Sequence, residues 1–169
     1  MINDNNDKIL IEFIYDTIQS YKQVINSLGP KNPVVKKISN ALSHLIRQYD
    51  RVEYVSKELV DQLILNKQIK SPLEIFDYNW KHRKLLNAMY EHTTPVKELK
   101  ESLIWHIENK EKAEEYLTKN ALICWMTYEE NRKLDANGFK STRPGGWKNC
   151  YQVCGVNVYS KSDLIKKGF

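Results

Sequence analysis

The stretch from Trp80 to Pro95 holds the residues best suited to chemistry in this chain. It contains two of the four histidines, a cluster of basic side chains, and an adjacent acid–histidine pair, Glu91 and His92. A carboxylate can hold a divalent metal ion on a phosphate, and a neutral imidazole can take a proton from water. One common kind of nuclease centre combines both groups, so Glu91 and His92 are the candidate catalytic residues.

The six residues EHTTPV, at positions 91–96, resemble the Asp/Glu-His-x-x-Pro segment of the HNH (ββα-metal) nucleases. The resemblance implies that Glu91 is a metal ligand, that His92 is the general base, and that Mg²⁺ or Mn²⁺ is the cofactor. It also implies a further metal ligand downstream, for which Asn109 and His106 are the candidates. Helical patterns flank the segment here, where that family has a β-hairpin, and the Cys-x-x-Cys pairs of many members are absent.

A structural role for the same pair is the alternative. Glu91 and His92 would then form the last turn of a helix, where a histidine is favoured by the negative end of the helix dipole. The four residues 81–84 before them are all basic or histidine, but consecutive residues spread around a helix and do not face one ligand. From this block we keep Arg83 as a candidate contact to nucleic acid.

The second candidate site is the loop that ends in the sequence Arg-Pro-Gly-Gly-Trp-Lys. Its glycines permit a close backbone approach, its cations can contact phosphate, and its tryptophan can stack on a base. The predicted nucleic-acid-binding residues are Lys140, Arg143, Gly145, Gly146, Trp147 and Lys148. In the alternative interpretation, Trp147 and Tyr151 pack onto the core. No complete glycine-rich phosphate motif is present.

The charge distribution also indicates an anionic partner. The chain carries 26 basic and 21 acidic residues, a net charge of +5. Residues 137–169 hold six basic residues and one acid, so the whole excess lies in this segment. A basic segment that also carries aromatic residues favours binding of nucleic acid, either DNA or RNA.

The remaining composition predicts an intracellular, cytoplasmic protein without a membrane partner. No apolar run approaches the roughly 18 residues of a membrane span, and the polar, acidic N-terminus is unlike a signal peptide. The three cysteines are an odd number and form no disulfide framework. Cys150 and Cys154 would share a helix face, but their spacing is not the usual design of a zinc site.

Apolar residues spaced three and four apart, together with helix-start signals, predict a largely helical N-terminal part. We expect helices at 8–28, 34–49, 52–64, 71–90, 94–107 and 111–118, which makes a bundle of about five to six helices. In this arrangement Glu91 and His92 lie at a break between two helices. Trp80, Trp105 and Trp125 are expected to be structural.

The C-terminal part has a different pattern. The apolar run 121–126 and the alternating residues 155–159 predict two strands, which we expect to pair antiparallel. A capping box at Thr127 and Glu130 predicts a helix between them, and further short helices are expected over 147–153 and near the C-terminus. The fold class is therefore mainly α: a helical domain over 1–118, and a small basic α+β subdomain over 119–169 that packs on it.

These features lead to two functional hypotheses. The first is a nucleic-acid-interacting protein that uses the basic aromatic C-terminal loop, with an HNH-like phosphodiesterase centre at Glu91 and His92. The alternative is a small non-enzymatic module that binds proteins, such as an inhibitor or an adaptor from a mobile element or a defence system. Whether the chain is an enzyme stays open at this point.

Overall fold

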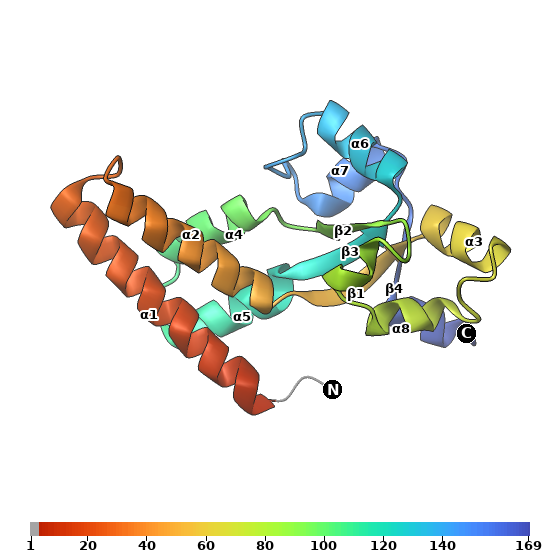
Figure 1. Ribbon diagram of the computed structural model, residues 1–169, viewed down its shortest axis with the longest axis horizontal. Coiled ribbons are helices and arrows are strands. Elements are labelled where there is room, and N and C mark those ends of the chain that lie inside the picture. The colour runs from red at the N-terminus through yellow and green to blue at the C-terminus, as the bar shows by residue number, and fades with distance from the viewer. Residues whose placement is uncertain (1–3) are drawn as a thin grey trace. The chain divides into compact units, whose positions relative to one another are not determined.

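The computed structural model describes residues 4–169, and helices dominate this part of the chain (Figure 1). The mainly α fold class is therefore confirmed. The chain forms two compact units, one of Met1–Asp50 with Val96–Ala121 and one of Arg51–Pro95 with Leu122–Phe169. It passes between them after residues 50, 95 and 121, and the last of these points lies close to the boundary expected after residue 118. The division into a helical domain over 1–118 and a subdomain over 119–169 that packs on it stays a prediction.

The first unit is helical. Its helices are α1 (Asp4–Leu28), α2 (Pro33–Gln48), α4 (Val96–His106) and α5 (Lys110–Asn120). The side chain of Asn32 accepts a hydrogen bond from the amide of Val34, which starts α2 as the Asn-Pro pair predicts. The helices expected over 8–28 and 34–49 are confirmed.

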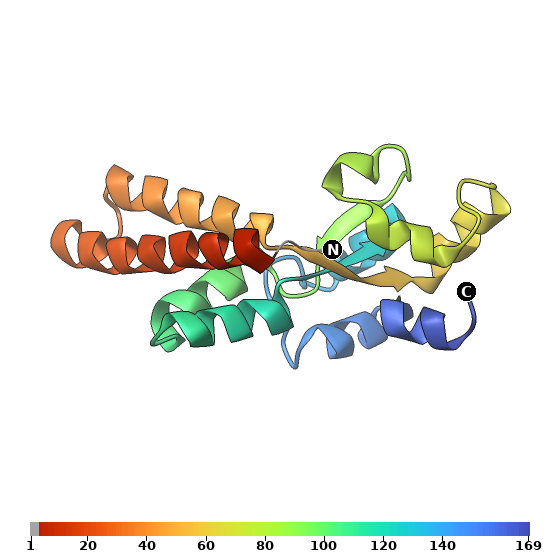
Figure 2. The ribbon, with the colours of Figure 1, turned by 90° about the horizontal axis from the view of Figure 1, so that it is seen from below.

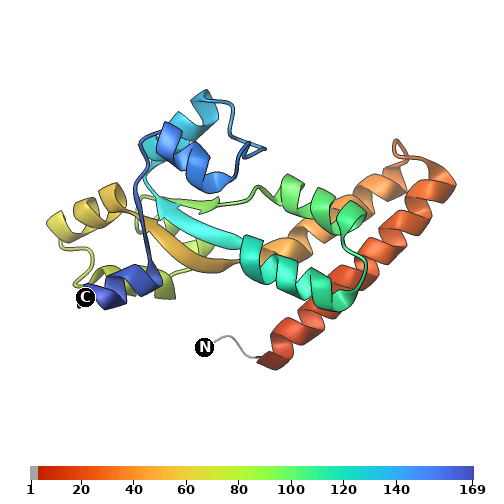
Figure 3. The same ribbon diagram turned by 180° about the vertical axis from the view of Figure 1, so that it is seen from behind.

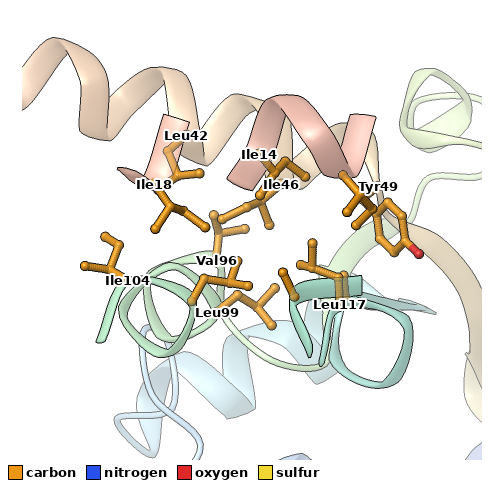
Figure 4. Close-up of a cluster of buried hydrophobic side chains, with 13 residues drawn as sticks. Ile14, Ile18, Leu42, Ile46, Tyr49, Val96, Leu99, Ile104 and Leu117 are labelled. Atoms are coloured by element: carbon orange, nitrogen blue, oxygen red, sulfur yellow. The ribbon is translucent and has the colours of Figure 1, made fainter. Parts of the chain in front are cut away.

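The four helices of this unit share one apolar core (Figure 4). Ile14 and Ile18 from α1 meet Leu42 and Ile46 from α2, and Leu99 of α4 lies beneath them. Complete burial of one such side chain stabilises the fold by about 1.5–3 kcal/mol relative to its exposure. The stripes that predicted these helices are thus the surfaces that hold the unit together.

The second unit is built on a four-stranded mixed sheet with the strand order β2-β3-β1-β4 (Figure 3). The strands are β1 (Arg51–Ser56), β2 (Met89–His92), β3 (Leu122–Met126) and β4 (Val158–Ser160). β1 and β3 are parallel, and the two edge strands run antiparallel to their neighbours. The expected two-stranded antiparallel pair is therefore wrong, because β1 lies between β3 and β4.

Two layers of helices cover the two faces of this sheet. On one face Trp125 and Val55 pack against α3 (Lys57–Leu65), the 3-10 helix η1 (Pro72–Asp77), the chain after η2 (Trp80–Arg83), and α8 (Lys161–Lys166). On the other face Cys124 and Met126 pack against α6 (Tyr128–Ala136) and α7 (Trp147–Val153). Figure 2 shows η1 and η2 on one side of the strands and α7 on the other.

Two expected helices are wrong in this unit. Residues 52–64 form strand β1 followed by helix α3, with Ser56 as the N-cap between them. Residues 71–90 form η1, η2 and the start of strand β2. The bundle of about five to six helices expected over residues 1–118 is therefore not formed. The chain also places Glu91 and His92 on a strand, whereas a break between two helices was expected.

The capping box predicted at Thr127 and Glu130 is confirmed at the start of α6. Ser71 caps η1, and Ser160 with Asp163 forms the capping box of α8. The strand expected over 121–126 and the helix expected over 147–153 are also present. Within residues 4–169, no helix has the length and apolar character needed to cross a membrane.

Candidate functional site

The three central positions of the sheet bring Glu91, Cys124 and Tyr54 into one row. Glu91 of β2 is opposite Cys124 of β3, and Cys124 is opposite Tyr54 of β1. Residues in register on neighbouring strands point to the same face, so this row lies beneath α7. Polar and titratable groups thus meet on the face that also carries the predicted basic loop.

Glu91 forms an ion pair with Arg143 of that loop. The guanidinium Nη2 lies 2.5 Å from the carboxylate Oε1, and the side chains are 1% and 20% exposed, respectively. Burial raises the pKa of Glu91, and the charge of Arg143 opposes this shift. The sequence predicted Glu91 as a metal ligand and Arg143 as a phosphate contact. In the structure the charges of these two side chains neutralise each other.

The two glycines of the loop shape the turn that follows Arg143. Gly145 and Gly146 have φ angles of +73° and +87°, a region that side-chain-bearing residues rarely adopt. The amide of Gly146 donates to the carbonyl of Arg143 over 2.8 Å, which closes the turn. The chain then enters α7 with Trp147 directed at the sheet. The structural role of the glycines is therefore this turn.

Trp147 lies between two tyrosines. Its ring centroid is 4.6 Å from that of Tyr54 and 5.2 Å from that of Tyr151, and the ammonium of Lys148 lies 5.6 Å from the centre of its ring. Trp147 is half-buried, so packing uses part of the ring and leaves part of it accessible.

A cavity of about 340 Å³ opens beside these rings. The half-buried rings of Tyr54 and Trp147 and the buried ring of Tyr151 supply its aromatic lining, while Lys148 and Asp163 bring one charge of each sign. Hydrogen bonds from Ser160 lower the pKa of Asp163 below its ordinary value. We call this space the Trp147 cavity. Its volume lies within the range of small-ligand sites.

The net charge of the chain lies entirely in the unit that holds this cavity. The first unit has 11 basic and 11 acidic residues, and the second has 15 basic and 10 acidic residues, a difference of +5. Lys140 and Lys148 are exposed near the loop, as predicted for phosphate contacts. Arg143 differs, because its charge is internal and paired.

The proposed metal ligands are distributed over both units. Glu91 and His92 belong to β2 in the second unit, whereas His106 ends α4 and Asn109 precedes α5 in the first. The side chain of Asn109 accepts from the amide of Lys112 over 2.9 Å and caps α5. In the part of the chain that is described, no group of three or more His, Cys, Asp or Glu side chains is placed to hold a metal ion.

A buried polar network at the other end of the sheet was not predicted. β1 and β3 are parallel, so the helices that follow them begin at the same edge, capped by Ser56 and Thr127. The Glu130 Oε2 atom accepts from the hydroxyl of Ser56 over 2.6 Å, and from the amide and hydroxyl of Thr127 over 2.9 and 3.0 Å. The predicted capping box accounts for the contacts between Glu130 and Thr127. The contact between Glu130 and Ser56 was not predicted, because Ser56 was assigned to the interior of a helix.

The three tryptophans expected to be structural divide into two groups. Trp125 is fully buried between Val55 and Tyr90, which confirms its assignment. Trp80 and Trp105 are exposed, so the expectation is wrong for both. Trp80 lies next to Arg83, whose guanidinium carbon is 5.8 Å from the centre of the ring.

Comparison of the chain with protein-family models, with curated proteins and with solved structures finds no match. The likeness to HNH nucleases therefore remains a local one, confined to residues 91–96.

Proposed function

We propose that the unit of Arg51–Pro95 and Leu122–Phe169 binds nucleic acid, with a base in the Trp147 cavity and phosphates on Lys140 and Lys148. The observation that carries the proposal is the aromatic lining of this cavity in the unit that holds the whole net charge. Aromatic side chains stack on bases of any sequence, and lysines follow the backbone. The partner is DNA or RNA.

Arg143 has a different role in this proposal from the phosphate contact that the sequence predicted. Its ion pair with Glu91 joins the loop to strand β2. Its role in this proposal is to position the loop, while Lys140 and Lys148 make the phosphate contacts. Gly145 and Gly146 serve by forming the turn between them.

The test is a binding titration of the full chain with labelled single-stranded and duplex oligonucleotides at several salt concentrations. The double variant Lys140→Ala with Lys148→Ala should bind more weakly and lower the slope of log K against log salt by about 1 per lysine. The matched control is Lys36→Ala with Lys37→Ala, which removes two exposed lysines from α2 of the neutral unit. Equal losses in both variants, or no binding by the wild type at low salt, would contradict the proposal.

A catalytic version of this function adds HNH-like hydrolysis centred on Glu91 and His92. It is supported by the local likeness of residues 91–96. Successive side chains on strand β2 alternate between the two faces of the sheet, so the Glu91 carboxylate and the His92 imidazole point to opposite faces. Mg²⁺ or Mn²⁺ would hold a phosphate in that mechanism, with Asn109 and His106 as the further candidate ligands. A metal ion on Glu91 would have to share the carboxylate with Arg143 or displace it.

The alternative function, a protein-binding module, is favoured by one observation in the first unit. Ile9 and Phe13 are one helical turn apart on α1, and both are exposed. Neighbouring exposed apolar side chains on a helix suit a partner helix or groove. Replacement of both by serine would abolish such an association without changing nucleic-acid binding.

A further inference from the structure

The turn of residues 80–85 presents an aromatic and basic surface that the Trp147 cavity does not include. Trp80 is 54% exposed and Leu85 is 65% exposed. Lys81, Arg83 and Lys84 are exposed between them. A large apolar side chain surrounded by cations at the surface indicates a contact site, because folding gains nothing from its exposure. We call residues 80–85 the Trp80 surface.

Local hydrogen bonds hold this turn in one conformation. The side chain of Asn79 accepts from the amide of Lys81 over 3.1 Å, and the His82 Nδ1 atom accepts from the amide of Asn79 over 3.1 Å. The ring of His82 also stacks on Tyr78, with centroids 4.9 Å apart. The exposed side chains therefore project from a turn with a defined backbone.

The turn is also anchored to the sheet. The amide of Ala88 donates to the carbonyl of Arg83 over 3.0 Å, and Leu86 and Ala88 are buried among the residues that cover Trp125. Burial of Leu86 directly after exposed Leu85 fixes which side of the turn faces outward. Such preorganisation lowers the entropy lost when a ligand binds.

The cations of the Trp80 surface form no ion pairs with other described residues of the protein. Across residues 4–169, no acidic side chain forms an ion pair with Lys81, Arg83 or Lys84. The Arg83 guanidinium instead lies near the Trp80 ring. An anionic ligand would meet three cations here that no acidic side chain already pairs, and an exposed indole beside a guanidinium adds a surface on which a base can stack.

We propose that the Trp80 surface is a second nucleic-acid contact and that its ligand is a single strand, an inference that rests on the proposed function. A duplex is read by an α-helix or a β-ribbon in its major groove, and η2 is a single 3-10 turn of four residues. Bases that are free to unstack can lie on Trp80 while their phosphates meet Lys81 and Lys84.

The two contacts lie on opposite faces of the sheet. The chain after η2 packs on the face of Trp125, and α7 packs on the face of Cys124. A strand that occupies both sites must therefore pass around an edge of the sheet. Only an oligonucleotide long enough to do so gains from both contacts, because the second binding event is then intramolecular.

The experiment compares labelled oligothymidylates of about 6 and about 30 nucleotides, since a single OB fold covers roughly 4–16 nucleotides of single strand. The wild type should bind the long oligomer at least about tenfold more tightly per site than the short one. The variant Trp80→Ala with Arg83→Ala should lose this preference, and Trp80→Phe should retain most of it. The control Trp105→Ala, which removes an exposed tryptophan from α4, should leave it unchanged.

The outcomes separate the two proposals. Wild-type affinity in the Trp80→Ala, Arg83→Ala variant, with loss of binding in the Lys140→Ala, Lys148→Ala variant, overturns the Trp80 surface and leaves the proposed function standing. The reverse pattern supports the Trp80 surface and overturns the Trp147 cavity. No binding by the wild type overturns both. Duplex bound as tightly as the single strand, or binding of phosphatidylserine vesicles that depends on Trp80 without binding of oligonucleotides, overturns the single-strand assignment.

Discussion

Arg143 donates a hydrogen bond from Nη2 to the Oε1 atom of Glu91 over 2.5 Å, and the two residues lie 52 positions apart in the chain. This contact joins the start of the loop before α7 to the edge strand β2. It also neutralises the Glu91 carboxylate on the face of the sheet that α7 covers. Its removal should therefore affect both stability and the position of the loop.

Replacement of Arg143 by methionine should destabilise the protein by about 3–5 kcal/mol, because Glu91 would remain buried without its partner. The double variant Arg143→Met with Glu91→Gln should recover part of this loss. The control is Lys97→Ala, which removes an exposed pair with Glu101 and should cost at most about 1 kcal/mol. Urea denaturation followed by circular dichroism measures all three, and a loss below 1 kcal/mol for Arg143→Met would show that the ion pair is not stabilising.

Ser56→Ala should destabilise the second unit by about 1–3 kcal/mol. The hydroxyl of Ser56 caps α3 by accepting from the amide of Leu59 over 3.2 Å and donates to the buried carboxylate of Glu130. The substitution removes both hydrogen bonds, so the buried amide of Leu59 and the buried carboxylate of Glu130 lose the Ser56 hydroxyl as a partner. Ser27→Ala in α1, where the hydroxyl is exposed, should change stability by less than about 0.5 kcal/mol under the same conditions. Equal effects of the two changes would exclude a special role for the network.

The thiols should be unreactive in the folded protein. Burial raises the pKa of Cys124 well above its ordinary value and also raises that of Cys154, and Cys150 is buried. A raised pKa lowers the fraction of thiolate at a given pH, and the thiolate is the reactive form. At pH 8, a disulfide reagent should label the native protein slowly and the guanidinium-unfolded protein at all three cysteines. The variant Val153→Cys adds an exposed thiol and should react at once with one equivalent.

The catalytic version of the proposal predicts metal-dependent cleavage. With Mg²⁺ or Mn²⁺ the wild type should hydrolyse DNA or RNA, and His92→Ala should lower the rate by about 10²-fold or more through loss of the general base. A chelator should abolish cleavage. His44→Ala, at an exposed position of α2, serves as the control and should retain the wild-type rate. Cleavage by His92→Ala at the wild-type rate, or none by the wild type, would remove the enzymatic part of the proposal.

Local signals in the sequence were sufficient to predict an element that is stabilised by contacts among its own residues. The apolar stripe of α1 and the capping box at Thr127 and Glu130 involve contacts within a few positions, and both were predicted correctly. Strand β3 was also identified, because five consecutive residues that form a buried strand give a compact apolar run. Spacing and composition contain this information directly.

The errors concern elements that depend on distant partners. Val52, Val55 and Leu59 have helical spacing, yet β1 is a strand because β3 and β4 pair with it on both sides. The same limit applies to the candidate site. From the sequence alone Arg143 is indistinguishable from a phosphate ligand, because its partner Glu91 lies far away in the chain. The exposure of Trp80 likewise depends on the burial of Leu86 against the sheet. Contacts across many positions leave no periodic trace in a single sequence.

The order of the strands has a consequence for synthesis on the ribosome. β1 precedes both of its sheet neighbours in the chain, and its partner β3 is separated from it by α4 and α5 of the other unit. Until residues 122–126 leave the ribosome, the backbone amides and carbonyls of nascent β1 have no neighbouring strand to pair with. During this time β1 is a potential site of association with other chains. This high contact order should make formation of the sheet slower than assembly of the α1–α2 hairpin. The helical hairpin is thus available as a folded N-terminal segment before the unit that carries both proposed contacts can close.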